Sequence, residues 1–208
     1  VRSGSPFGNI DRVIAGPGKI RVTGWILDPD TAGTIALRVQ LDGTTVATAT
    51  TDVDRPDIRA LYPGYGSVHG FDVTVPASNG LRTVRVVGVD VGPGSNAVVG
   101  TRQVLVGGNP FGNFEAAAVT FGGVVVSGWA IDPDTADPIP MHVYIDGRMA
   151  GEGMADKRRP DVGAAHPLYG ANHGFAFWTG ISPGRHQVCV FAINQGPGTD
   201  NPMLGCRT

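Results

Sequence analysis

The sequence contains few charged residues and almost no lysine or glutamate. Charged residues make up 16% of its 208 residues, and the formal net charge is −2 at pH 7. Lysine and glutamate are good helix formers, so their scarcity disfavours a helical fold. The only basic run, Lys157 to Arg159, is typical of a solvated loop. Because nucleic acids require a larger basic patch, the sequence indicates no nucleic-acid partner.

Long apolar segments are also missing. No segment approaches the roughly 20 apolar residues that a membrane-spanning helix needs, so we expect no membrane span. Hydrophobic residues still make up 41% of the chain, which is enough for two cores. The 32 glycines and 16 prolines indicate many turns, and the abundant valine and threonine favour strands.

Cysteine occurs at only two positions, Cys189 and Cys206. The two residues flank consecutive strand-like segments, and antiparallel pairing of these segments would bring them side by side. A disulfide here would close a loop of roughly 17 residues and stabilise the fold by about 3 kcal/mol. Two buried free thiols are the alternative. The disulfide, which we favour because no metal-like spacing competes, implies an oxidising, extracytoplasmic setting.

The most informative feature of the sequence is a duplication. Gly24 to Ala32 returns as Gly128 to Ala136, and the same shift of 104 residues aligns His69 to Phe71 with His173 to Phe175. A repeat of this length is the size of a small domain, whereas solenoid repeats span about 20–50 residues. Since a glycine-rich linker surrounds Gly108, we expect two domains, residues 1–107 and 108–208.

Each copy has the pattern of an antiparallel β fold. Ile35, Leu37, Val39 and Leu41 alternate with polar residues, as a strand with one buried face does. Asp42-Gly43 is a hairpin-turn signal, and it returns in the second copy. About seven short strands per copy predict two tandem immunoglobulin-like antiparallel β-sandwich domains, with a small barrel as the alternative.

A change of alternation marks the first tryptophan of each copy. Ile20 and Val22 alternate, and then Trp25 and Leu27 are the large residues. We therefore expect a β-bulge at Gly24 that keeps Trp25 in the core, and the same arrangement for Trp129 in the second copy.

A segment of 15 residues, Asp54 to Val68, carries no strand signal, so it either covers an open end of the core or is functional. Within it Pro56 can begin a helical turn that Pro63 ends. Arg55 and Asp57, repeated as Arg159 and Asp161, could form a ligand clamp for carboxylates or sugar hydroxyls. The alternative is an internal bridge that fixes the segment, with Asp28 or Asp132 as the carboxylate partner.

Aromatic residues gather near the same segment. Tyr62, Tyr65 and Tyr169 can present an apolar face and a polar group to a sugar ring. Trp178 has no counterpart in the first copy, where Thr74 stands, and its position after Phe177 predicts that it is exposed. These side chains complete the predicted binding residues.

Each copy also contains an Asp-Pro-Asp turn, formed by Asp28 and Asp30 and by Asp132 and Asp134. Two carboxylates at this spacing could hold Ca²⁺ if backbone carbonyls joined them. The alternative is that the carboxylates accept hydrogen bonds from backbone N–H groups of the turn. The first copy matches a calcium-binding loop only in part, and we expect no other cofactor.

No catalytic constellation is present in both copies. His69 and His173 precede Gly-Phe, but no serine or cysteine stands in a matching place in both copies. These histidines are typical of hydrogen-bonded structural residues. The sequence therefore predicts a protein that is not an enzyme.

The repeated motifs resemble a known type of domain. The segments Gly128 to Thr135, Arg159 to Val162, His173 to Phe175 and Leu204 to Arg207 resemble a β-sandwich repeat of actinobacterial secreted and cell-surface proteins. Such repeats are often appended to cell-wall hydrolases. The resemblance covers nearly the whole chain and implies export and an appended, non-catalytic role.

We therefore expect an extracellular module that binds the bacterial cell envelope or its glycans. A cell-wall glycan or a surface protein would be its partner. The alternative is a structural spacer, or a subunit of a surface assembly or filament that associates through its edge strands.

Overall fold

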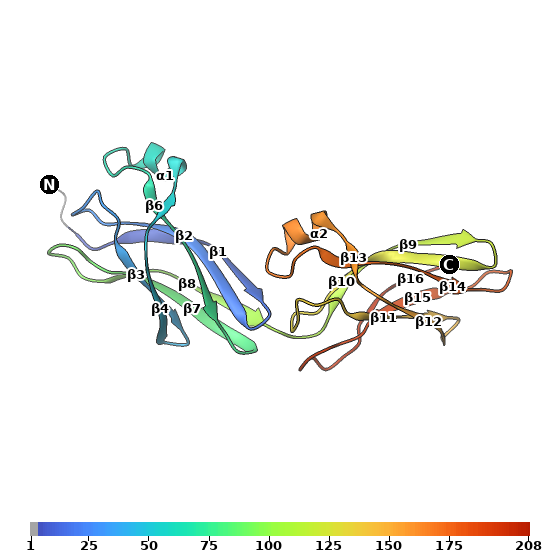
Figure 1. Ribbon diagram of the computed structural model, residues 1–208. Coiled ribbons are helices and arrows are strands. Elements are labelled where there is room, and N and C mark those ends of the chain that lie inside the picture. The colour runs from blue at the N-terminus through green and yellow to red at the C-terminus, as the bar shows by residue number, and fades with distance from the viewer. Residues whose placement is uncertain (1–3) are drawn as a thin grey trace. The chain divides into compact units, whose positions relative to one another are not determined.

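The chain folds into two compact units, Val1–Val106 and Gly107–Thr208. The computed structural model describes residues 4–208 (Figure 1). Both units are built from antiparallel strands, so the predicted all-β class is confirmed. In residues 4–208, no helix combines the length and the apolar content needed to cross a membrane.

The first unit is a sandwich of two four-stranded sheets among the described residues. One sheet has the strand order β1-β2-β6-β5 and the other has the order β4-β3-β7-β8. This is the immunoglobulin arrangement with one additional strand, β4, at the edge of the second sheet. The bounds are β1 (Phe7–Gly16), β2 (Lys19–Leu27), β3 (Ala36–Leu41), β4 (Thr44–Thr50), β5 (Val53–Asp54), α1 (Pro56–Leu61), β6 (Val68–Pro76), β7 (Gly80–Gly88) and β8 (Ala97–Val106).

The second unit repeats this topology, with the orders β9-β10-β14-β13 and β12-β11-β15-β16. Its bounds are β9 (Phe111–Thr120), β10 (Gly123–Ile131), β11 (Pro140–Ile145), β12 (Arg148–Met154), β13 (Lys157–Arg158), α2 (Pro160–Ala165), β14 (Asn172–Gly180), β15 (Val188–Ala192) and β16 (Met203–Arg207).

Each unit has its own hydrophobic core between its two sheets. In the first unit Ile20, Val22 and Ile26 from β2 face Leu37 and Val39 from β3. These residues alternate along their strands with partly exposed ones, as a half-buried strand requires. A separate cluster around Phe175 and Val143 fills the second unit. Neither of the two described clusters contains a residue of the other unit, so each half has a core of its own.

The turn predictions are confirmed. Asp42 and Gly43 have φ angles of 49° and 87°, and Asp146 and Gly147 repeat this left-handed pair. Such a pair matches the right-handed twist of the two flanking strands. The predicted helical turn is α1, and Pro56 is its first residue.

The prediction that Trp25 lies in the core is wrong. Gly24 is buried and continues the inward series of β2, so Trp25 points to the outer face and is only partly buried. The Phe71 ring fills the space beside Gly24, because a Cβ on Gly24 would lie 2.6 Å from Phe71 Cζ. The bulge lies in the neighbouring strand instead, at Asp11 of β1.

The second unit contains the same correction. Trp129 is partly buried on the outer face of its sheet, and Gly128 faces the Phe175 ring. The register shift opposite Gly128 leaves Glu115 of β9 without a partner in β10. In both units, therefore, the bulged residue of the first strand carries a carboxylate.

The predicted disulfide is confirmed. Cys189 and Cys206 lie directly opposite each other on β15 and β16 and are bonded through their sulfur atoms. Arg85 and Thr101 occupy the same paired positions on β7 and β8 of the first unit. Only one unit therefore has this covalent link among the described residues.

Candidate functional site

In the first unit, Arg55 binds two carboxylates at the start of α1. Its Nε and Nη2 donate to both oxygens of Asp57 at 2.8 and 2.7 Å, and its Nη1 donates to Asp11 Oδ2 at 2.6 Å. Asp11 is the bulged residue of β1. The bridge therefore fixes the segment that contains α1 to the outer face of the first sheet.

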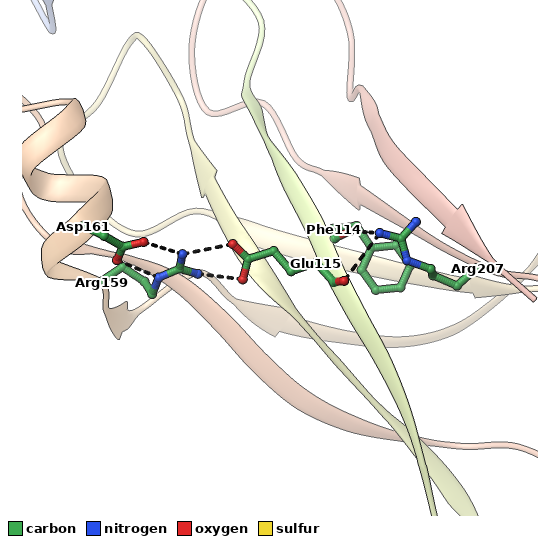
Figure 2. Close-up of polar contacts among 5 residues, drawn as sticks. All are labelled: Phe114, Glu115, Arg159, Asp161 and Arg207. Atoms are coloured by element: carbon green, nitrogen blue, oxygen red, sulfur yellow. Dashed lines mark hydrogen bonds and ion pairs between the residues drawn. The ribbon is translucent and has the colours of Figure 1, made fainter.

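The second unit builds the same bridge. Arg159 donates to Asp161 at 2.9 and 2.7 Å and to the two oxygens of Glu115 at 2.9 Å each. Figure 2 shows the guanidinium of Arg159 between these two carboxylates. The prediction that Asp28 and Asp132 are the partners is wrong. The bulged residues Asp11 and Glu115 bind the arginines instead.

These bridges determine which groups a ligand can reach. The arginine side chains are 21% and 25% exposed, whereas those of Asp57 and Asp161 are 60% and 64% exposed. The hydrogen bonds from each arginine lower the pKa of its aspartate to about 2. Both aspartates are therefore ionised at neutral pH, and they, rather than the bridged guanidinium groups, face solvent as hydrogen-bond acceptors.

A cluster of rings lies on the same outer face of the first unit. Phe7 packs edge-on against Trp25 with centroids 6.0 Å apart, and Tyr62 packs against Trp25 at 5.8 Å with the planes tilted by 38°. Tyr62 closes the cluster by contacting Phe7 at 5.4 Å. Since Tyr62 directly follows α1, the arginine bridge also positions this ring.

The second unit has Phe111, Trp129 and His166 in the same places, with His166 5.5 Å from Trp129. Burial and the charge of His173 lower the pKa of His166. A neutral imidazole is consistent with its packing against the indole. We call the two sets together the ring clusters: Phe7, Trp25 and Tyr62, and Phe111, Trp129 and His166.

The remaining tyrosines of the segment are anchored through their backbones. The carbonyl of Tyr65 accepts a hydrogen bond from Nε2 of buried His69 at 2.6 Å, and Tyr169 and His173 repeat this contact at 3.0 Å. Burial, followed by the charges of Asp134 and Asp132, raises the pKa of the Tyr169 hydroxyl to about 12. Its neutral phenol can therefore donate a hydrogen bond.

Trp178 is exposed, as predicted, with a relative accessibility of 57%. It pairs with Val125 on β10, four residues from the position of Trp129 on that strand. Four residues of strand correspond to roughly 13 Å, so Trp178 lies on the same sheet face but apart from Arg159 and Tyr169. Its indole covers Gly123, where any side chain would collide with it.

The Asp-Pro-Asp turns connect separate segments. Asp28 is fully buried, and its two oxygens accept hydrogen bonds from the backbone N–H groups of Asp30 and Val91 at 2.9 and 3.0 Å. Asp30 in turn accepts from the N–H of Gly4. These contacts join the turn after β2 to the loop after β7 and to the start of the unit.

In the second unit the same turn makes the same connections. Asp132 accepts from the N–H groups of Asp134 and Gln195, and Asp134 accepts from that of Gly108. The hydrogen bonds repeat those of the first unit, so this pattern belongs to the fold of both halves.

For the calcium hypothesis, the first unit offers oxygens of Asp28, Asp30 and Asp90 that lie within 4.8 Å of one another. Asn194 replaces Asp90 at the matching position of the second unit. Both oxygens of Asp28 already accept backbone hydrogen bonds. The carboxylates of all four turn aspartates thus accept hydrogen bonds from backbone N–H groups. The third carboxylate of the first unit, Asp90, has no counterpart in the second unit.

One constellation escaped the sequence analysis. Ser182 Oγ lies 3.2 Å from His186 Nε2, and His186 Nδ1 lies 2.6 Å from Asp146 Oδ2. This connectivity is that of a hydrolase triad. In the first unit, however, Arg82 stands in place of the histidine and bonds to both Ser78 and Asp42.

An arginine cannot act as a general base, because it stays protonated in proteins. The arrangement that the two units share therefore connects the hairpin turn after β3 or β11 to the loop after β6 or β14. Sequence reasoning missed it because the histidine and the aspartate lie 40 residues apart.

Comparisons with known proteins add little to this geometry. No family model and no curated protein matches the chain. The apo structure of Bacteroides uniformis β-glucuronidase 3 aligns with 90% of this chain and 23% of its own, with a TM-score of 0.29 and 10% identity. The Yersinia pseudotuberculosis adhesin InvE aligns with 96% of this chain and 58% of its own, with a TM-score of 0.31 and 13% identity.

The chain thus spans about a quarter and somewhat over half of these two structures. Similarity at these scores does not bear on activity or on partners. The fold and the site define a tandem immunoglobulin-like β-sandwich module.

Proposed function

We propose that this chain is a non-catalytic, extracellular tandem module that binds the glycans of a bacterial cell envelope. The observation that carries the proposal is the repetition of one surface in both units. Each unit places a ring cluster and an exposed carboxylate, Asp57 or Asp161, on the outer face of its first sheet.

The chemistry of this surface suits a saccharide. Aromatic rings offer an apolar face to the C–H groups of a sugar ring, and the carboxylates accept hydrogen bonds from its hydroxyls. The arginine bridges hold both groups in place before binding, which reduces the ordering cost of association. Trp178 extends the aromatic surface of the second unit along the same sheet face.

Two further features support an appended, extracellular role. The disulfide is typical of proteins that fold in an oxidising compartment. Two weak sites in tandem gain avidity when a linker lets both engage one polymer. A repeated surface is therefore useful to a protein that binds a repetitive glycan, whereas a repeated active site is seldom needed.

A glycan array and isolated cell walls test the proposal. We expect the full chain to bind envelope polysaccharides. Binding should weaken when Tyr62→Ala and His166→Ala remove the outer ring of each cluster. Arg38→Gln, on an exposed position of the other sheet, is the matched control and should leave binding unchanged. The proposal fails if the full chain binds none of these polymers, or if the control loses as much binding as the ring variant.

A structural role in a surface assembly is the second candidate. The observation that favours it is the edge position of β4 and β12 in their sheets, since each of these strands pairs with a neighbouring strand on one side only among the described residues.

A further inference from the structure

The two units differ on the outer face of their first sheets, beyond the ring clusters. In the first unit this part of the face is charged. Arg21 of β2 donates a hydrogen bond to Asp72 of β6 at 2.7 Å, and Arg12 lies on the adjoining strand β1. Thr23 and Thr74 pair with these residues across the strands, so the whole area is polar.

The second unit has small, uncharged residues at the same places. The repeat shift of 104 residues brings alanine or valine to the positions of the three charged residues, and the strand pairing agrees with this alignment. All these side chains are exposed or partly exposed, and none of them is ionisable. We call this surface the apolar face, formed by Ala116, Ala118, Val125, Ser127, Ala176 and Trp178.

A pair of glycines makes room for Trp178 on this face. Gly123 and Gly180 are paired on β10 and β14, where the first unit pairs Lys19 with Pro76. Gly123 holds an outward position of β10 but is buried, because the indole lies over it and a Cβ there would be 2.1 Å from Trp178 Nε1. The tryptophan and the glycine beneath it therefore occur together in the second unit, and neither occurs at these places in the first.

The size of the apolar face bears on its occupant. It consists of six side chains on three strands, four of them alanine or serine. A specific protein–protein interface takes about 20–30 residues from each partner, so this face is too small for a second copy or another protein. Trp129 pairs four residues away from Trp178 along β14, and this distance of roughly 13 Å exceeds the length of one sugar ring. These dimensions suit a linear saccharide.

The chemistry of the face limits the saccharide further. An anionic polymer would need positive charge, and the second unit has alanine and valine where the first has Arg12 and Arg21. A sugar whose ring hydroxyls are all equatorial, as in glucose, presents C–H groups on its faces, and these pack against an indole. A β-1,4 linkage keeps a chain of such sugars extended along a strand, whereas an α-1,4 linkage curves the chain.

We propose that the second unit binds an uncharged, extended glycan of glucose-like sugars joined by β-1,4 linkages. One sugar packs on Trp178, and the chain runs along β14 toward Trp129. This inference rests on the proposed glycan function and names its substrate class. It also separates the two units, because the ring clusters are common to both whereas the apolar face belongs to the second.

An NMR titration of the full chain with cellohexaose, a β-1,4-linked glucose oligomer, tests the proposal. Maltohexaose, its α-1,4-linked counterpart, is the matched sugar. We expect cellohexaose to shift the indole N–H signal of Trp178 and the backbone amides of Val125 and Ala176. Maltohexaose should leave these signals unchanged at the same concentration. Equal shifts with both sugars, or shifts with neither, would overturn the proposal.

Two substitutions test the ring and its position, and each installs the residue of the first unit. Trp178→Thr should lower the affinity for cellohexaose about two- to tenfold. Gly123→Lys keeps the tryptophan but displaces its indole, so it should lower the affinity to a similar extent. Met149→Thr, at an exposed position of β12 in the other sheet, is the matched control and should bind like the wild type. Unchanged affinity in either of the first two variants contradicts the proposal.

Cosedimentation with bacterial cell walls separates this proposal from the one on which it rests. If Trp178→Thr binds the walls like the wild type while Tyr62→Ala with His166→Ala binds more weakly, the ring clusters bind the envelope and the apolar-face proposal is wrong. If the wild type binds no cell walls but binds cellohexaose through Trp178, the proposed envelope function is wrong and the apolar face is still a glycan site.

Discussion

Removal of the disulfide should destabilise one unit and spare the other. Cys189 and Cys206 are 17 residues apart in sequence, and a loop of this length implies about 3 kcal/mol of stabilisation at 25 °C. The paired replacement Cys189→Ala and Cys206→Ala should lower the free energy of unfolding of the second unit by about this amount. A loss of this size raises the population of its unfolded state about 150-fold.

Hydrogen exchange read by mass spectrometry can resolve the two units, because their peptides are separable. Exchange through full unfolding should accelerate about 150-fold in β15 and stay unchanged in β2. The matched variant for a gain of stability in the first unit is Arg85→Cys with Thr101→Cys, which places cysteines at the equivalent paired positions of β7 and β8. Acceleration of similar size in both units would refute the reasoning, because the units would then unfold as one.

Three other predictions follow from particular contacts. Gly24→Ala should destabilise the first unit by about 1–3 kcal/mol in urea unfolding, because the new methyl would collide with the backbone carbonyl oxygen of Asn9 and would lie 2.6 Å from the Phe71 ring. Gly64→Ala meets open space and should be neutral. The pKa of Asp57 falls from its ordinary 3.8 to about 2 on folding, so its ionised form stabilises the fold above pH 3.8, and this contribution disappears as the pH falls toward 2. Asp57→Asn should therefore reduce the dependence of the free energy of unfolding on pH in that window. Ser182 should form no adduct with a fluorophosphonate by mass spectrometry; a stoichiometric adduct would show that its hydrogen-bonded chain is catalytic.

The strands with clean alternation could be predicted from the sequence. Two features depend on neighbours along the chain: the series from Ile35 to Leu41 and the Asp42-Gly43 turn. The cysteine pair depends on two consecutive strands. The first strand of each unit could not be identified, because β1 is an edge strand whose alternation is interrupted by a bulge at Asp11.

The tryptophan error has a physical cause. Gly24 occupies an inward position but has no side chain, so the series of large residues changes phase while the alternation of inward and outward positions continues. The large residue that follows, Trp25, then lies on the outer face, where Phe7 and Tyr62 cover it. A glycine at an inward position facing a large ring, here Phe71, is the signal that would have identified this arrangement.

The candidate site could be predicted only in its local part. Arg55 and Asp57 are two residues apart, and their pairing follows from the short helix that they begin. The second carboxylate, Asp11, lies 44 residues away, and its position depends on the bulge in β1. Contacts of this range follow from the packing of whole strands, which local sequence patterns do not reveal.

Cosedimentation of the full chain with purified bacterial cell walls tests the central claim most directly. The account predicts saturable binding. Tyr62→Ala alone should weaken it about two- to tenfold, since each ring contact contributes about 0.5–1.5 kcal/mol, and adding His166→Ala should weaken it further because avidity is lost. Binding that is absent, or that is equal for the wild type and the double variant, would contradict the claim that the repeated ring clusters bind the envelope.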